Sequence, residues 1–277
     1  MRMRIDAHQH FWRFDPVRDS WIRDDMSIIK RDFLPGDLQP LLEQAGINGC
    51  IAVQADQSED ETDFLVELAN ANTFIKGVVG WVDLQSENVE ERLAHFHQFQ
   101  IIKGFRHVLQ GESRRDLMLT PAFINGIAAL QEFGFTYDLL IFPDQLNFCK
   151  KLVARLPEQK FVLDHLGKPY INKGEIKEWK EDMAAMAKHP NVYCKLSGMV
   201  TEADWRAWKM EDIKPYLDVV TNAFGTDKIM FGSDWPVCLV AAEYSQTIEI
   251  INEYFSPFSS NEKQKIFGEN AIRFYNL

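Results

Sequence analysis

Eight short apolar runs recur along the chain, and segments with helical spacing lie between them. Most runs are rich in Val, Ile and Phe and end at Gly, Pro or polar residues, as buried strands do. The first and last begin at residues 5 and 229, which is 224 residues over seven intervals, or 32 per unit. A barrel of eight strand–helix units, with about 250 residues, has nearly that period. The runs are 5–10, 50–56, 76–84, 101–107, 135–142, 161–167, 192–198 and 229–236.

The segments between the runs carry helix start and stop signals. The segment 121–133 follows Thr120, a good N-cap, and Gly134 after it is a typical stop signal. A helix near the end of the chain is expected to begin at Ser260 or Asn261. Regular alternation of strands and helices favours a parallel sheet.

The chain of 277 residues is therefore predicted to be a single α/β domain, a (β/α)8 TIM barrel that uses residues 1–277. Eight units use up the length and leave no room for a second domain. An open doubly wound sheet is the alternative, but the glycine fingerprint of a dinucleotide fold is missing after the first run.

One connection is much longer than the usual loop of a compact domain. Residues 11–34 are mixed and irregular, and long loops of this kind are usually functional or disordered. The large aromatic residues Trp12, Phe14 and Trp21 argue against disorder. We expect this segment to be a folded lid over the strand ends.

Composition excludes several classes of protein. The net charge of −11 disfavours binding to nucleic acids and to anionic membranes. The sequence has no uncharged apolar stretch long enough to span a membrane, and residues 1–6 lack the apolar core of a signal peptide. The four cysteines are far apart, which indicates reduced, buried thiols and a cytoplasmic location. The sequence contains no pattern that predicts an oligomeric state.

The strongest chemical signal is the pair His8 and His10 at the end of the first run. Residues two apart on a strand share a face, so the two imidazoles could hold one ion of the zinc type. A second pair, His95 and His97, lies in a helical segment, where residues two apart point about 200° from one another. We therefore expect no shared ion at that second pair.

Two more candidates end later runs. His165 ends the sixth, and Asp234 ends the eighth, where a carboxylate needs a cation, hydrogen-bond donors or water. In a closed barrel these two residues converge with His8 and His10 at the carboxyl ends of the strands, where catalytic groups lie. Three imidazoles and one carboxylate suit zinc or a related divalent ion, and they also suit acid–base chemistry without a metal.

Other polar groups sit near strand ends. Alternation directs Gln54 and Lys195 inward, and Trp81 and Arg106 lie near the ends of the third and fourth runs. Arg106 and Lys195 are candidates for contacts with the substrate or an oxyanion, since a cation in a water-poor site stabilises developing negative charge. Further candidate substrate-binding residues are Gln54, Trp81, His107 and Trp12.

These motifs resemble a known family. The chain begins with Asp-Ala-His-Gln-His-Phe-Trp and continues with Gly-Phe-Arg-His, Asp-His-Leu-Gly-Lys-Pro, Lys-Leu-Ser-Gly and Gly-Ser-Asp-Trp-Pro. In this order they are similar to the amidohydrolase superfamily, and more narrowly to its branch of sugar lactonases and 2-pyrone-4,6-dicarboxylate hydrolases. The resemblance covers nearly the whole chain and is more specific for the branch than for a substrate.

The resemblance implies a (β/α)8 barrel with His8, His10, His165 and Asp234 in the active site. Binuclear members of the superfamily carry a bridging carboxylated lysine at the end of strand four, where this chain has Arg106. The resemblance therefore implies at most one divalent ion, zinc first, held by those four residues. Some relatives in the branch work without a metal, so metal dependence stays open at this point.

The function expected from this resemblance is hydrolysis of a small sugar lactone. Water attacks the lactone carbonyl, and Asp234 acts first as general base and then as general acid. Gln54, Trp81 and the Trp12 loop are expected to hold the sugar ring. The alternatives are a dicarboxylate lactonase, a zinc-dependent decarboxylase of an unsaturated or aromatic acid, and a non-catalytic binding protein on a barrel scaffold.

Overall fold

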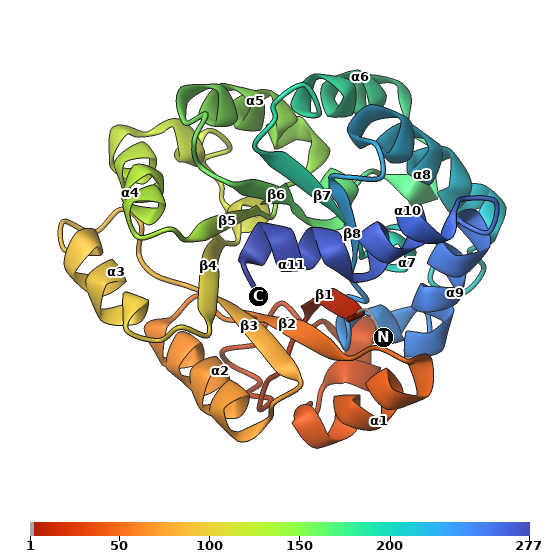
Figure 1. Ribbon diagram of the computed structural model, residues 1–277, viewed down its shortest axis with the longest axis horizontal. Coiled ribbons are helices and arrows are strands. Elements are labelled where there is room, and N and C mark those ends of the chain that lie inside the picture. Colours follow the sequence, from red (N-terminus) through yellow and green to blue (C-terminus); the bar gives the residue numbers. More distant parts are fainter. Residues whose placement is uncertain (1–2) are drawn as a thin grey trace.

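The computed structural model describes residues 3–277 and confirms the barrel (Figure 1). Eight parallel strands follow one another around the sheet in chain order, with helices outside them. Each predicted run overlaps one strand. Met1 and Arg2, part of the segment searched for a signal peptide, lie outside the described residues. The strands are β1 (Ile5–Gln9), β2 (Gly49–Val53), β3 (Ile75–Gly80), β4 (Ile102–His107), β5 (Thr136–Leu139), β6 (Phe161–Leu163), β7 (Val192–Leu196) and β8 (Ile229–Phe231).

The barrel closes between the ends of β1 and β8. The backbone N–H of Asp234 donates to the carbonyl of His8 at 2.8 Å, and the N–H of His10 donates to the carbonyl of Trp235 at 2.7 Å. Three of the four predicted active-site residues therefore lie on the seam that closes the barrel.

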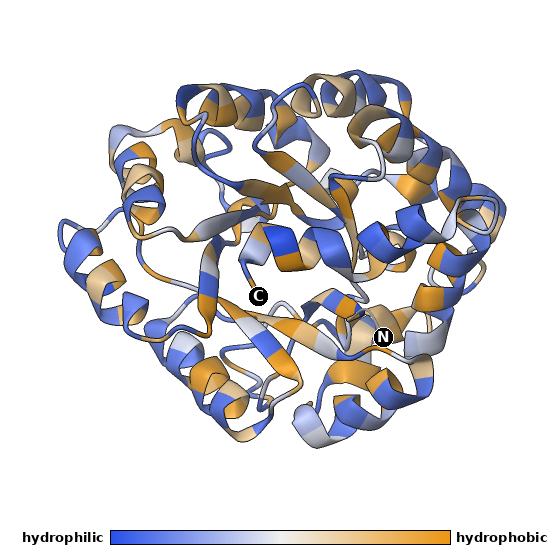
Figure 2. Ribbon diagram, in the orientation of Figure 1, coloured by the Kyte–Doolittle hydropathy of each residue, from blue (hydrophilic) through white to orange (hydrophobic). Residues whose placement is uncertain are grey.

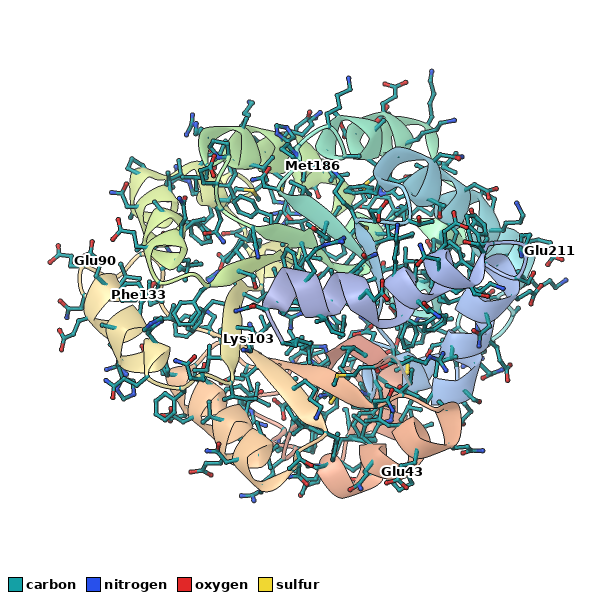
Figure 3. All side chains as sticks on the ribbon, in the orientation of Figure 1. Glu43, Glu90, Lys103, Phe133, Met186 and Glu211 are labelled. Atoms are coloured by element: carbon teal, nitrogen blue, oxygen red, sulfur yellow. The ribbon has the colours of Figure 1, made fainter. Side chains whose placement is uncertain are left out.

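Helices form the outer layer, and both hydropathy colours alternate along each of them (Figure 2). Acidic side chains such as Glu43, Glu90 and Glu211 extend outward from this layer (Figure 3). The longer helices are α1 (Pro35–Ala45), α2 (Glu59–Ala71), α3 (Val89–His97), α4 (Pro121–Glu132), α5 (Leu146–Arg155), α6 (Lys177–Met186), α8 (Met210–Phe224) and α9 (Tyr244–Tyr254). Shorter ones are α7 (Met199–Glu202), α10 (Ser260–Gln264) and α11 (Asn270–Tyr275).

Of the two predicted N-cap residues, the one for α4 is confirmed and the one for α10 is wrong. The Thr120 hydroxyl accepts from the N–H of Phe123 and caps α4, as expected. The prediction of Ser260 or Asn261 for α10 is wrong by one residue. Ser259 is the N-cap, because its hydroxyl accepts from the N–H of Glu262 while the Glu262 carboxylate accepts from the N–H of Ser259.

The apolar core has two parts. The larger lies between the sheet and the helices, and a smaller one fills the lower end of the barrel with Ile5, Ala7, Ile51 and Val162. Phe274 of α11 joins this smaller cluster. The last helix therefore covers the amino-terminal end of the barrel (Figure 1), and chemistry is confined to the opposite end.

Residues 11–34 form an ordered segment that contains some regular structure. Trp12 and Phe33 exchange two backbone hydrogen bonds at 3.0 and 2.9 Å, which ties the ends of the segment together. A short 3₁₀ helix, η1 (Asp24–Ile29), lies between them. The Trp12 ring packs edge-on against Trp21 and Phe33, so the aromatic residues order this connection.

Two further expectations can be compared with the described residues. All four cysteines are buried and free. Within residues 3–277, no helix combines the length and apolar character needed to cross a membrane.

Candidate active site

A cavity of about 910 Å³ opens at the carboxyl ends of the strands. Its wall contains five of the predicted site residues, which are His10, Trp12, Arg106, His165 and Asp234. Trp21, Arg23 and Met26 of the 11–34 segment form another part of the wall. The cavity is therefore bounded by both the strand ends and the long connection after β1.

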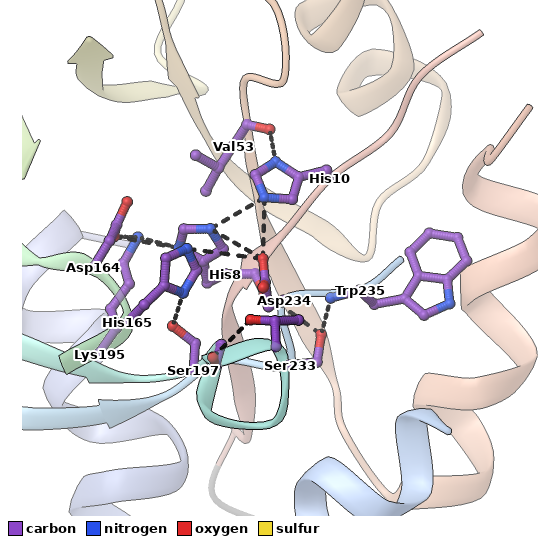
Figure 4. A network of polar contacts seen from close by, with 12 residues as sticks. His8, His10, Val53, Asp164, His165, Lys195, Ser197, Ser233, Asp234 and Trp235 are labelled. Carbon is purple, nitrogen blue, oxygen red and sulfur yellow. Dashed lines mark hydrogen bonds and ion pairs between the residues drawn. The ribbon is translucent and has the colours of Figure 1, made fainter. Parts of the chain in front are cut away.

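Four of the predicted residues meet at the floor of this cavity (Figure 4). The Nε2 atoms of His8 and His10 are 3.2 Å apart. Asp234 Oδ1 is 3.4 Å from His10 Nε2 and 3.8 Å from His8 Nε2. His165 Nε2 is also 3.8 Å from that oxygen. The histidines and the aspartate thus form one cluster, whose side chains are almost completely buried.

The donor atoms of His8, His10 and Asp234 lie close enough together to hold a single metal ion. Two ligands about 2.1 Å from one tetrahedral ion lie about 3.4 Å apart, close to the separations found here. The other nitrogen of His10, Nδ1, lies 2.8 Å from the Val53 carbonyl, which can only accept a hydrogen bond. The proton therefore sits on Nδ1 and leaves the Nε2 lone pair facing the cluster, as metal-ligating histidines require.

The cluster combines neutral imidazoles at His8 and His165 with an ionised carboxylate at Asp234. Burial lowers the pKa of His165 to about 4 and holds the pKa of His8 well below its usual range. Burial alone raises the pKa of Asp234, but the surrounding imidazoles outweigh it and lower that pKa overall. At neutral pH His8 and His165 therefore offer neutral nitrogen donors, and Asp234 offers an anionic oxygen.

A bulge in β1 aims the first two histidines. Ile5 and Ala7 point into the barrel, so strict alternation would turn His8 outward. The pairing register shifts between Asp6 and Gln9. Over this stretch β1 advances by three residues while its partner β2 advances by only two, from Cys50 to Ala52. The extra residue reverses the phase, and both His8 and His10 then face the interior.

A left-handed turn aims the third histidine. Asp164 faces inward at the end of β6, and alternation would send His165 outward. His165 instead has φ of +53° and Leu166 has φ of +55°, both in the left-handed region. This turn brings two consecutive side chains, Asp164 and His165, to the same interior.

Two glycines make room for the histidines. A Cβ on Gly198 would lie 2.5 Å from His165 Nδ1, and one on Gly232 would lie 2.6 Å from the His8 Cβ. Gly198 also has φ of +63°, which side chains rarely adopt. Both positions require glycine for the imidazoles to stay in place.

A layer of buried charges supports the cluster from below. Asp164 Oδ1 lies 3.3 Å from His8 Nδ1 and 3.0 Å from Lys195 Nζ, and its Oδ2 accepts from Arg106 at 3.1 Å. Lys195 also donates to Asp138 at 2.5 Å. Burial alone raises the pKa of Asp164, but Lys195, His8 and Arg106 hold it well below its usual range. Asp164 therefore remains ionised beneath His8.

A model of the amidohydrolase family matches residues 5–277. The chain belongs to the amidohydrolase family. The resemblance drawn from the motifs is thereby confirmed at the level of the family.

Two relatives of this amidohydrolase are named L-fucono-1,5-lactonases. The chain is 40% identical to an L-fucono-1,5-lactonase of Burkholderia multivorans, over 99% of this chain and 96% of the relative. It is 32% identical to an L-fucono-1,5-lactonase of Burkholderia ambifaria, over 100% and 97% of the two chains. A crystal structure of an amidohydrolase from Burkholderia multivorans with bound Zn matches with a TM-score of 0.95 and 39% identity, over 99% of each chain.

Two residues predicted to contact substrate lie below the cavity of this amidohydrolase. Lys195 is fully buried, and its Nζ is 3.1 Å from His8 Nδ1. Gln54 is also fully buried; it donates to the Arg106 carbonyl at 3.1 Å and accepts from the Arg106 guanidinium at 3.2 Å. The structure thus places Lys195 beneath His8 and Gln54 beside Arg106, where each positions a neighbour rather than reaching a ligand.

Trp81 and His107 also differ from expectation. Arg106 faces the barrel, so alternation turns the next residue, His107, toward the helices. Its ring packs on Phe123 of α4, and its Nε2 lies 2.7 Å from Glu112 Oε1. Trp81 donates to His107 Nδ1 at 3.4 Å. Neither residue is among the described residues that line the cavity.

Sequence reasoning missed several residues at this site. Asp164 precedes His165 in the same motif, and its place at the end of a strand was an available signal. Lys168 follows in that motif and lines the cavity, as does Glu202 of α7. Glu202 follows no strand directly, and no pattern in the sequence marks it.

Proposed function

We propose that this amidohydrolase hydrolyses a sugar lactone, with an L-fuconolactone or a related aldonolactone as substrate. The observation that carries the proposal is the cluster of Asp234 with three histidine imidazoles at the floor of a cavity of about 910 Å³. The full-length similarity to two L-fucono-1,5-lactonases gives the reaction class. It also favours a lactonase over the decarboxylase and the non-catalytic binding protein.

Asp234 is the proton carrier in the proposed reaction. Its lowered pKa keeps it ionised, so it can accept a proton from a water molecule between itself and the imidazoles. That water attacks the carbonyl carbon as its proton moves to Asp234. The carboxylic acid then returns the proton to the ring oxygen as the C–O bond of the ester breaks.

Arg106 is the cation placed for the developing oxyanion. Its guanidinium lines the cavity, and Nη1 lies 3.4 Å from His8 Nε2. The Gln54 side chain and backbone carbonyl hold Nη2 from the other side. A cation fixed in this way needs little reorganisation when negative charge appears on the carbonyl oxygen.

We further propose that His8, His10, His165 and Asp234 hold one divalent ion, zinc first. The donor atoms of His8, His10 and Asp234 lie close together, and His165 Nε2 is 3.8 Å from the same carboxylate oxygen. The neutral state of His8 and His165 also supports this. When bound, the ion would supply Lewis-acid stabilisation of negative charge. The zinc-bound structure of a relative 39% identical to this chain points to the same element.

Residues 11–34 are proposed as the lid of this site. Trp12 and Trp21 line the cavity from this segment, and the face of a tryptophan suits the C–H side of a sugar. The free cysteines agree with a reducing, cytoplasmic location. The enzyme would then serve carbohydrate catabolism, with a small neutral lactone as its partner.

A pH-indicator assay tests the proposal. Purified protein, supplied with zinc, is screened against fucono-, rhamnono-, galactono- and arabinono-lactones, and we expect acid release from at least one. The same samples are assayed for carbon dioxide release from aromatic acids and for opening of 2-pyrone-4,6-dicarboxylate. Decarboxylation without lactone opening would replace the proposal with the decarboxylase alternative.

A further inference from the structure

The turn after β6 contains four consecutive residues in the left-handed region. His165, Leu166, Gly167 and Lys168 have φ of +53°, +55°, +68° and +50°. L-residues avoid this region, because Cβ crowds the following carbonyl, and runs of them are rarer still. Strained backbone of this kind persists where the surroundings hold it, and it concentrates at functional sites.

The surroundings hold this turn at two points. Trp179 of α6 donates its indole N–H to the Leu166 carbonyl at 2.9 Å, and the Leu166 side chain is fully buried. The Lys168 N–H donates to the His165 carbonyl at 2.7 Å. The turn is therefore a fixed feature of the barrel rim.

The turn brings two side chains to one cavity. His165 joins the floor cluster, and Lys168 enters the wall. Positioning His165 alone accounts for the beginning of the turn. It does not account for Lys168, the fourth residue, whose long side chain is directed into the site instead of toward solvent.

In the wall Lys168 meets Glu202 of α7. Lys168 Nζ is 2.9 Å from Glu202 Oε1, and the two side chains are only 16% and 15% exposed. Burial raises the pKa of Glu202, which Lys168 partly offsets. Both residues line the same cavity as Asp234.

This pair has the hydrogen-bonding capacity that a polyol needs. The ammonium has three donors and uses one on Glu202, while the second carboxylate oxygen of Glu202 remains an acceptor. Adjacent hydroxyls of a sugar ring each donate and accept, so they can bond to both groups at once. The pair carries no net charge, so it offers no excess positive charge to a dicarboxylate.

We propose that Lys168 and Glu202 form a hydroxyl-binding pair that makes the enzyme select polyhydroxylated lactones. This inference rests on the proposed lactone hydrolysis and assigns the part of the site that recognises the sugar. The other role open to the pair is structural, an ion pair that fastens α7 to the turn after β6. A structural pair would affect every lactone alike.

The experiment compares two lactones. The first is the aldonolactone that the wild type opens best, and the second is δ-valerolactone, which has the ester but no ring hydroxyls. The quantity compared is kcat/KM for the aldonolactone divided by kcat/KM for δ-valerolactone. For Glu202→Gln and Lys168→Met we expect this ratio to fall about 10- to 100-fold, the usual effect of losing a hydrogen bond to a charged group in a site. The loss should lie mainly in KM for the aldonolactone. Lys214→Met, which removes an exposed ion pair with Asp218 on α8, is the matched control.

The possible results distinguish the hydroxyl-binding role of the pair from a structural role and from a failure of lactone hydrolysis itself. An unchanged ratio in folded variants, with equal losses on both lactones, overturns the hydroxyl-binding role and leaves lactone hydrolysis intact. A wild type that opens no lactone overturns both. If Glu202→Gln fails to fold by circular dichroism, Glu202→Asp keeps the charge but withdraws the carboxylate by one methylene, and the same fall in the ratio is expected.

Discussion

Asp164 and Lys195 form an ion pair of 3.0 Å directly beneath His8, and the side chains of both residues are completely inaccessible to solvent. Burying one such charge alone is very costly, so the two are retained together. Asp138, on the other side of Lys195, accepts from the Tyr275 hydroxyl of α11. The charges under the active site are thereby connected to the helix that covers the other end of the barrel.

Replacing Lys195 tests how far this pair supports the fold. Lys195→Met has similar volume but leaves Asp138 and Asp164 facing each other without the ammonium. We expect a loss of about 3–5 kcal/mol in the free energy of unfolding, the usual result of breaking a buried pair. Urea denaturation measures it, and the double variant Asp138→Asn/Lys195→Met should recover part of the loss. Equal stability of the wild type and Lys195→Met would show that the buried charges do not depend on one another.

Asp234→Asn separates chemistry from structure. The amide matches the carboxylate in shape but cannot accept a proton from water, so kcat should fall by about 10²- to 10⁴-fold. Circular dichroism should show an intact fold, and Asp218→Asn on the surface serves as the control. Turnover near that of the wild type would exclude Asp234 as the proton carrier.

The barrel and its central cluster follow from the sequence because each depends on local pattern. A period of 32 residues and alternating strands and helices determine the layers, and catalytic groups gather at the carboxyl ends of parallel strands. Position at those ends was enough to bring together His8, His10, His165 and Asp234.

Alternation fails where the backbone departs from a regular strand. The bulge in β1 and the left-handed turn after β6 determine where His8 and His165 point. No sequence motif predicts the bulge or the turn. A sequence pattern also does not show how far below the cavity an inward side chain lies. Alternation correctly predicts that Lys195 points inward. Whether it contacts a substrate or supports His8 from below depends on how far along β7 it lies.

Gly198→Ala tests the space that His165 requires. The added methyl would lie 2.5 Å from His165 Nδ1 and should displace the ring, and a shift of about 1 Å can cost 10²-fold in rate. Gly174→Ala is the matched control, since its φ is +66° but nothing lies within 4 Å of the new Cβ. Both variants should lose roughly 1–2 kcal/mol of stability from the left-handed backbone. Only Gly198→Ala should lose activity as well, and similar activity losses in both would refute a specific effect on His165.

Metal content can be measured apart from catalysis. We expect about one equivalent of zinc per chain by elemental analysis, and a rise in Tm when zinc is added to chelated protein, because a ligand that binds only the folded state stabilises it. His10→Ala removes one nitrogen donor and should reduce both the zinc content and the rise in Tm. His95→Ala is the control, because His95 lies on the outer helix α3 and its ring packs on Phe96 and Phe99. Identical zinc content in wild type and His10→Ala would remove His10 from the proposed ligand set.

Glu61 of α2 predicts a specific pH dependence of stability. Its carboxylate is buried and accepts at 3.0 Å from the N–H of Ala55, a residue that lines the cavity. Burial raises its pKa to about 7, with only partial compensation from that hydrogen bond and from Arg18. The folded state therefore prefers protonated Glu61, and this contribution is fully present below the unfolded pKa, about 4.5, and is lost as the pH rises through 7.

The comparison of wild type with Glu61→Gln isolates this effect. The amide keeps the acceptor and cannot ionise, so the wild type should lose roughly 2.5 kcal/mol relative to the variant between pH 5 and pH 8. Urea denaturation at the two pH values gives both free energies of unfolding. Glu67→Gln, on the exposed side of the same helix, should show no such difference. If the gap between wild type and Glu61→Gln is the same at both pH values, Glu61 is already ionised in the folded protein at pH 5, and Arg18 and the Ala55 N–H compensate its burial in full.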